Sequence, residues 1–202
     1  MEQTFLISTT AYFLALINPA SKVFLLASMD PPYKWKGLWN VCFRSTVVAF
    51  FILILLAVAG NLVLESIFHV HIYSLNVAGG IILFVVGFNA VQKGRFYEET
   101  ALKRVSDISV VPLAAPFIAG PGTITAAISY PAIHGLQSTI LCITLALLLN
   151  FLIMLTSLQI GRFLEKINLI GPLIRITGLV VTAVAVQMIF TGCGAWLKEL
   201  GI

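Results

Sequence analysis

The sequence predicts an all-α integral membrane protein whose six transmembrane helices form an inverted 3+3 repeat, with spans 1 and 4 broken at mid-membrane. Three observations favour this fold. The 202-residue chain is 59% apolar and only 10% charged, with a mean hydropathy of +1.03. The apolar residues fall into long stretches, and two of these stretches are interrupted by proline about half a chain apart. This composition excludes an ordinary soluble domain.

Each apolar stretch is close to the ~20 residues that a helix needs to cross ~30 Å of hydrocarbon. The predicted spans cover residues 4–29, 39–63, 72–91, 110–133, 138–160 and 173–196. The N-terminal segment begins Met1-Glu2-Gln3, without a positive segment or a clear cleavage site, so we expect it to be a membrane span and not a signal peptide. The short linkers leave no room for a soluble domain.

The basic residues predict the orientation of the chain. Most of them lie in or beside the linkers that follow spans 1, 3 and 5: Lys34, Lys36, Arg44, Lys93, Arg95, Lys103, Arg104, Arg162, Lys166 and Arg175. The opposite side carries Lys198. The positive-inside rule places the basic linkers in the cytoplasm and both termini outside. The net charge of +4 is therefore a topology signal, and we expect no nucleic-acid partner.

The two halves of the chain resemble each other. Residues 1–91 and 110–202 each contain three predicted spans, joined by the polar segment 92–109. Identical residues recur at a shift of 100: Cys42/Cys142, Phe51/Phe151, Leu55/Leu155, Leu64/Leu164, Glu65/Glu165 and Ile67/Ile167. Pro19 and Pro121 match at a shift of 102, and Gly79 and Gly178 at 99. An odd number of spans inverts the second half, which predicts a pseudo-two-fold axis in the membrane plane.

Two further features concern packing. In the segment between the halves, Glu98 and Glu99 precede Lys103 at helical spacing, which favours a short surface helix. Spans 3 and 6 are rich in small residues, which let membrane helices approach closely. These small residues are Ala78, Gly79, Gly80, Gly87, Ala90, Thr177, Gly178, Thr182, Ala183 and Ala185.

The interruptions have the residue pattern of helix starts. Asn18-Pro19-Ala20-Ser21 and Gly120-Pro121-Gly122-Thr123 each place proline where a helix begins, so we expect half-helices to start at Pro19 and Pro121. A half-helix N-terminus presents unpaired N–H groups and a partial positive charge, which suit an anion or a carboxylate. Thr123 and Thr125 add hydroxyls in this region. Two proline kinks packed against neighbouring helices are the structural alternative.

Lys22 is the charged residue nearest the first interruption. A lysine near a span centre costs about 2.5–3.5 kcal/mol on insertion scales, which makes it a functional candidate. The alternative is that its side chain extends to the cytoplasmic interface near Asp30. Other polar residues in the spans could bind a substrate or hydrogen-bond a neighbour: Asn76, Asn89, Asn150 and Gln187.

The sequence gives no indication of an enzyme. It contains no HExxH or GxSxG motif, no pair of carboxylates within a span and no metal-ligand spacing. All acidic residues lie near span ends or in polar segments, which argues against a carboxylate proton relay through the bilayer centre. We therefore expect no cofactor and no metal.

Three segments together resemble the MarC family of bacterial and archaeal inner-membrane proteins. They are Ala15-Leu16-Ile17-Asn18-Pro19, the run Val111-Pro112-Leu113-Ala114-Ala115-Pro116-Phe117-Ile118-Ala119-Gly120-Pro121-Gly122-Thr123-Ile124, and Arg175-Ile176-Thr177-Gly178-Leu179 with Ala185-Val186-Gln187. The resemblance implies an inner-membrane location and the transport of small neutral amino acids such as glycine and alanine. Many relatives continue the first motif with a small residue and a proline, where this chain has Ser21-Lys22-Val23-Phe24.

The leading hypothesis is a secondary transporter that works by alternating access. Its substrate carboxylate would bind at the two interruptions, at Asn18, Pro19, Ser21, Lys22, Gly120, Pro121, Gly122, Thr123 and Thr125. An anion-selective channel, an exporter of another small solute and a structural membrane protein are the alternatives. The coupling ion, proton or sodium, and the oligomeric state stay open.

Overall fold

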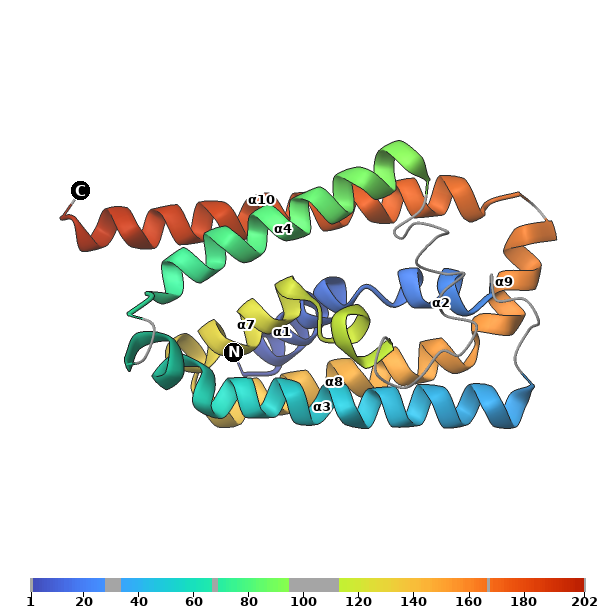
Figure 1. Cartoon of the computed structure of the whole chain (residues 1–202), viewed down its shortest axis with the longest axis horizontal. Helices are drawn as coiled ribbons and strands as arrows, with labels where there is room; N and C mark the ends of the chain where they lie inside the picture. Colours follow the sequence, from blue (N-terminus) through green and yellow to red (C-terminus); the bar gives the residue numbers. More distant parts are fainter. Residues whose placement is uncertain (1, 28–33, 67–68, 95–112, 167, 202) are drawn as a thin grey trace.

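The structure is a computed structural model that describes residues 2–27, 34–66, 69–94, 113–166 and 168–201. Helices make up the secondary structure of these residues (Figure 1). In chain order they are α1 (Glu2–Ile17), α2 (Pro19–Ala27), α3 (Trp35–Ser66), α4 (Ile72–Lys93), the π-helix η1 (Leu113–Ile118), α7 (Pro121–His134), α8 (Leu136–Leu155), α9 (Ser157–Lys166) and α10 (Ile170–Glu199). The predicted all-α class is confirmed.

Five described segments are long and apolar enough to cross a membrane: Thr4–Ala27, Trp35–Gly60, Ile72–Lys93, Leu136–Leu155 and Ile170–Glu199. They correspond to predicted spans 1, 2, 3, 5 and 6. The predicted span over 110–133 is represented by η1 and by α7, which has 14 residues and is shorter than the ~20 residues of a full span. The chain therefore has five to six membrane-crossing helices.

The fifth predicted span was too long. It was expected to run unbroken to residue 160, but α8 ends at Leu155 and α9 begins at Ser157. Between them, the Thr156 hydroxyl donates to the carbonyl of Ile153 at 2.7 Å, and the Thr156 N–H donates to the same oxygen at 3.1 Å. A threonine that bonds its own preceding turn competes with the helical ladder, which explains the break.

Of the segment between the halves, the structure describes residues 92–94. Gly94 ends α4 with a φ of 65°, a left-handed conformation that glycine adopts without strain. The surface helix expected from Glu98, Glu99 and Lys103 lies outside the described residues.

The helices form two groups in Figure 1. The helices α4 and α10 lie side by side and antiparallel along one side of a bundle of the remaining helices, which α4 contacts through α7. Small residues allow the close approach of this pair: a Cβ on Gly87 would lie 2.9 Å from the carbonyl oxygen of Gly178, and one on Gly192 would lie 2.7 Å from that of Tyr73. The predicted packing role of glycines in spans 3 and 6 is confirmed.

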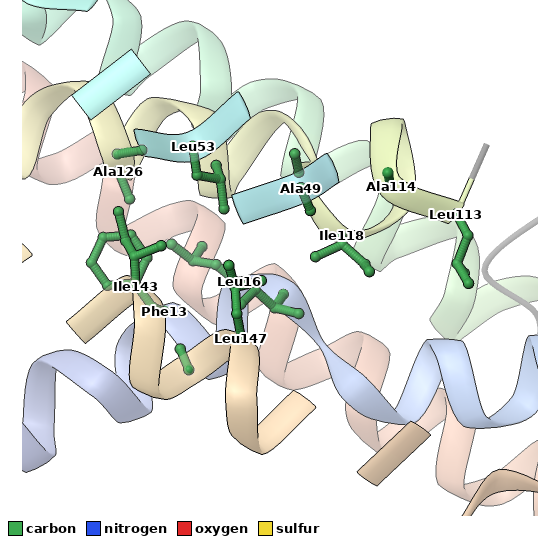
Figure 2. Close-up of a cluster of buried hydrophobic side chains, with 14 of the residues drawn as sticks. Phe13, Leu16, Ala49, Leu53, Leu113, Ala114, Ile118, Ala126, Ile143 and Leu147 are labelled. Atoms are coloured by element: carbon green, nitrogen blue, oxygen red, sulfur yellow. The ribbon is translucent and has the colours of Figure 1, made fainter. Parts of the chain in front are cut away.

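The core of the bundle lies between α1, α3, η1, α7 and α8. Its fully buried side chains include Phe13, Leu53, Ile118, Ala126, Ile143 and Leu147 (Figure 2). Large hydrophobic side chains also cover the outer surfaces of α3 and α8, such as Phe51, Leu55, Leu148 and Leu152. An apolar exterior of this kind suits a lipid bilayer and would be a liability in water.

The packing partners have a regular pattern. Helix α1 packs against α8, and α7 packs against α3. The helices α3 and α8 also pack against each other, as do α4 and α10. This network keeps the ends of α1 and η1 inside the bundle, where the two interruptions lie.

The α4–α10 contact leads to a first prediction. The Gly87→Ala substitution would place a Cβ 2.8 Å from the backbone nitrogen of Thr182 and 2.9 Å from the Gly178 oxygen. Because both contacts are with backbone, the helices must move apart, at an overpacking cost of about 1–3 kcal/mol. We expect a lower melting temperature of the purified protein in detergent, measured by intrinsic fluorescence.

The control is Gly194→Ala on α10, because a Cβ there would have nothing within 4 Å. Alanine favours helix over glycine, so this variant should melt at or above the wild-type temperature. Equal destabilisation by both substitutions would contradict the close α4–α10 contact.

Candidate functional site

The first interruption is a single residue, Asn18. Its φ of 55° is left-handed, a conformation that asparagine tolerates better than most residues. The Asn18 N–H donates to the carbonyl of Leu14 at 2.8 Å, which ends α1 in the αL motif. Helix α2 then begins at Pro19, as the sequence predicts.

Asn18 also caps the helix that follows it. Its Oδ1 accepts from the backbone N–H of Ser21 at 3.4 Å, and its carbonyl oxygen accepts from the Ser21 hydroxyl at 2.7 Å. The first of these contacts is the N-cap bond expected from the sequence, although the left-handed backbone was not foreseen. Asn18 is 8% exposed and Ser21 2% exposed, so this junction is buried in the protein.

Lys22 points back to the end of α1. Its ammonium donates to the carbonyl oxygen of Ile17 and to the hydroxyl of Ser21, the latter at 3.2 Å. The side chain is 3% exposed. Of the two positions expected for Lys22, the structure places the ammonium at the interruption and not at the end of the span.

The second interruption joins η1 to α7. The Ala119 N–H donates to the Ala114 carbonyl at 2.8 Å, and Gly120 is extended with φ −81° and ψ 174°. Helix α7 begins at Pro121, as predicted, and its first described bond runs from the Ile124 N–H to the Gly120 carbonyl at 2.8 Å. Since proline has no N–H, the groups left without an intrahelical acceptor are those of Gly122 and Thr123.

The two interruptions share a feature that the sequence analysis missed. In each, the last carbonyl of the incoming helix accepts from a side chain five residues later, in the first turns of the outgoing helix. The Lys22 side chain donates to the Ile17 carbonyl, and the Thr123 hydroxyl donates to the Ile118 carbonyl at 3.3 Å. A polar residue five positions after a predicted helix end would have been the signal.

The second interruption lies beside the end of α1. A Cβ on Gly122 would be 3.0 Å from Cδ2 of Leu16 and 2.9 Å from Cδ2 of Leu83. Leu16 lies two residues before Asn18, and it shares the core with Ile118 (Figure 2). The start of α7 therefore packs against the end of α1, with Gly122 providing the space.

The hydroxyls of α7 face other helices. Thr123 is fully buried and Thr125 is 2% exposed, with Thr125 packed against Gly79 of α4. The hydroxyl oxygen of Ser129 lies 2.7 Å from the carbonyl oxygen of Thr125 and 3.3 Å from Oδ1 of Asn76. Asn76 thus contacts a neighbouring helix, which is one of the two roles considered for it.

Asn150 is the most buried of the polar residues singled out in the spans. It is 0% exposed on α8, where its Nδ2 donates to Sδ of Met154 at 3.1 Å. Its Oδ1 has no hydrogen-bond partner among the described residues. Asn150 follows the core residue Leu147 by three positions, on a helix that packs against both α1 and α2. By contrast, Gln187 is exposed and Asn89 is half-buried.

The double role of Asn18 leads to a second prediction. Replacement by alanine removes the cap of α2. It also places alanine, whose side chain cannot hydrogen-bond to the backbone, in the left-handed region. Together these effects should lower the free energy of unfolding by about 2–3 kcal/mol. Replacement by glycine keeps the backbone conformation and should cost only a few tenths of a kcal/mol. Melting temperatures in detergent should therefore fall in the order wild type, Asn18→Gly, Asn18→Ala. Equal melting of the alanine and glycine variants would show that the left-handed backbone is not required.

Comparison with known proteins agrees with the resemblance of the sequence motifs. The family described as MarC family integral membrane protein matches residues 3–197. The UPF0056 membrane protein PH0214 of Pyrococcus horikoshii is 33% identical over 195 residues, which cover 96% of each chain. The UPF0056 membrane protein YvbG of Bacillus subtilis is 31% identical over 211 residues, covering 99% of this chain and 97% of the relative. No solved structure matches the chain. The match extends over nearly the whole sequence, and the chain belongs to the MarC family of integral membrane proteins.

Proposed function

We propose that this protein is a secondary transporter of small neutral amino acids, of the glycine or alanine type, and not an enzyme. The observation that carries the proposal is the pair of helix starts at Pro19 and Pro121, the second packed beside the end of α1. The prolines are half-buried, and the residues that follow them, Ser21 and Lys22 in α2 and Gly122 and Thr123 in α7, are buried. Broken helices of this kind form the substrate sites of many secondary transporters.

The substrate carboxylate would bind at the half-helix N-termini. At α7 the N–H groups of Gly122 and Thr123 are available to it by helix geometry, and at α2 the N–H of Ala20. The partial positive charge of a helix N-terminus stabilises an anion there without a cationic side chain. This arrangement fits a carboxylate inside an apolar bundle.

The substrate ammonium needs acceptors, and Asn150 supplies one. Its Oδ1 is buried and without a partner among the described residues, and a buried acceptor without a partner is costly. An amino-acid ammonium would satisfy it. We propose that Asn150 belongs to the site because α8 packs against both α1 and α2. A zwitterion would then bind better than a simple anion, which favours a transporter over an anion-selective channel.

We propose that the two halves form the inverted repeat, with both interruptions near the membrane midplane. The packing supports this pairing. Exchanging span 1 with 4, 2 with 5 and 3 with 6 converts the α1–α8 contact into the α7–α3 contact, and it maps α3–α8 and α4–α10 onto themselves. Rocking of the two inverted halves around the site would alternate access from the two sides.

The third prediction tests the site. Replacing Gly120 and Pro121 together by alanine lets the helix continue through the interruption, so that the N–H groups of Gly122 and Thr123 become bonded within it. The loss of charge-assisted hydrogen bonds, at about 1.5–3 kcal/mol each, should lower substrate affinity about tenfold or more. The measurement is glycine and alanine counterflow into liposomes, together with the rise in melting temperature that each amino acid produces in detergent.

Pro131→Ala is the matched control, because this proline lies within the same helix near its far end. It should leave counterflow at the wild-type rate. Counterflow at the wild-type rate in the double variant would contradict the proposed substrate site. Stabilisation of the wild type by chloride or phosphate alone would favour the anion channel, and stabilisation by another solute would favour an exporter of that solute.

The fourth prediction concerns orientation. We propose that the basic linkers are cytoplasmic and both termini outside, on the cell inner membrane, because of the positive-inside rule. In a Cys193→Ala background, a membrane-impermeant maleimide added to intact cells should label Lys198→Cys but not Lys36→Cys. Both positions are exposed, and the remaining cysteines, Cys42 and Cys142, are buried. The reverse labelling pattern would overturn the orientation.

A further inference from the structure

The ammonium of Lys22 occupies a position with the chemistry of a cation site. It lies at the C-terminal end of α1, where the helix dipole favours positive charge, and it contacts the Ile17 carbonyl and the Ser21 hydroxyl. Backbone carbonyls at half-helix C-termini are the groups that hold Na⁺ in transporters with broken helices. Neutral oxygens of this kind are also the ligands that hard cations prefer.

The second interruption shows that this carbonyl does not need a lysine. There the last carbonyl of the incoming helix, that of Ile118, accepts from the neutral hydroxyl of Thr123. The first interruption uses the amino group of a lysine for the corresponding bond, in a side chain that is 3% exposed. Since a lysine inside a membrane span is costly, its use here needs an explanation beyond satisfying one carbonyl.

We propose that Lys22 is a tethered cation, which takes the place of a coupling sodium ion at the end of α1. This inference rests on the proposed transport function for its physiological meaning. Its consequence is that the lysine amino group occupies the place of the ion at the first interruption, so that sodium is not bound there. Removing the side chain beyond Cβ should leave a space lined by the same two oxygens, open to a small cation.

The test is sodium binding by variants at this position. Lys22→Ala removes the ammonium and opens the space, whereas Lys22→Met removes the charge but fills the space with a side chain of similar length. Melting temperatures are measured in detergent in sodium chloride and in N-methylglucamine chloride at equal concentration, and ²²Na⁺ binding is measured on the same samples. Lys36→Ala, at an exposed lysine, is the control for general effects of charge removal.

Lys22→Ala should melt several degrees higher in sodium and bind ²²Na⁺, because a ligand that binds only the folded state stabilises it by mass action. The wild type, Lys22→Met and Lys36→Ala should melt equally in both salts. A folded Lys22→Ala that is indifferent to sodium would overturn the proposal, as would sodium binding by the wild type that Lys22→Ala abolishes. If Lys22→Ala cannot be purified, Lys22→Thr, which copies Thr123 of the second interruption, is compared in the same way.

The readout is binding, and it is independent of transport. Sodium binding gained by Lys22→Ala in a protein that moves no amino acid would sustain the tethered cation and refute the proposed function. If the wild type carries out amino-acid counterflow but Lys22→Ala binds no sodium, the proposed function would stand and the tethered cation would be refuted.

Discussion

Every backbone N–H and carbonyl inside a bilayer must find a partner within the protein, and this constraint governs the two interruptions on which the candidate site depends. At each of them a helix stops and another starts, which leaves carbonyls at one end and N–H groups at the other. Lys22 and Thr123 donate hydrogen bonds to the carbonyls of Ile17 and Ile118. The N–H of Asn18 donates to the last turn of α1, and its side-chain oxygen accepts from the first turn of α2. The helices themselves supply no acceptor for the N–H groups at the start of α7, and these groups are where the proposed transporter would bind a substrate carboxylate.

The sequence predicted the features that depend on local chemistry. Proline fixes a helix start wherever it stands, so the beginnings of α2 and α7 at Pro19 and Pro121 were correct. Hydropathy located the long helices, because a helix that crosses a bilayer needs a continuous apolar stretch however it packs against its neighbours. The glycines of spans 3 and 6 were correctly interpreted as packing residues, since only close contact of backbones explains them.

Features that depend on contacts across the bundle could not be predicted in this way. The direction of Lys22 was open, because a lysine near a break has enough reach for either the interface or a carbonyl. The end of α8 was missed, because Thr156 interrupts a uniformly apolar stretch through a bond to its own preceding turn. Nor does any spacing in the sequence show that Leu16 contacts Gly122, or that the amide of Asn150 is buried and that its Oδ1 finds no partner in the part of the chain that the structure describes. The inverted repeat itself stays a prediction, supported by the exchange of packing partners.

The two interruptions are alike in construction and different in charge. In both, a side chain five residues after the last carbonyl of the incoming helix donates to that carbonyl. Only the first holds a buried cation, beside a helix N-terminus that already bears partial positive charge. In the proposed transporter, this difference would give the two sides of the site different affinities for an anion and for a cation. In a carrier that alternates access by rocking one half against the other, this difference makes the outward-facing and inward-facing states unequal in energy. Position 22 is therefore where the two interruptions differ most clearly in chemistry, with a lysine at one and the hydroxyl of Thr123 at the other.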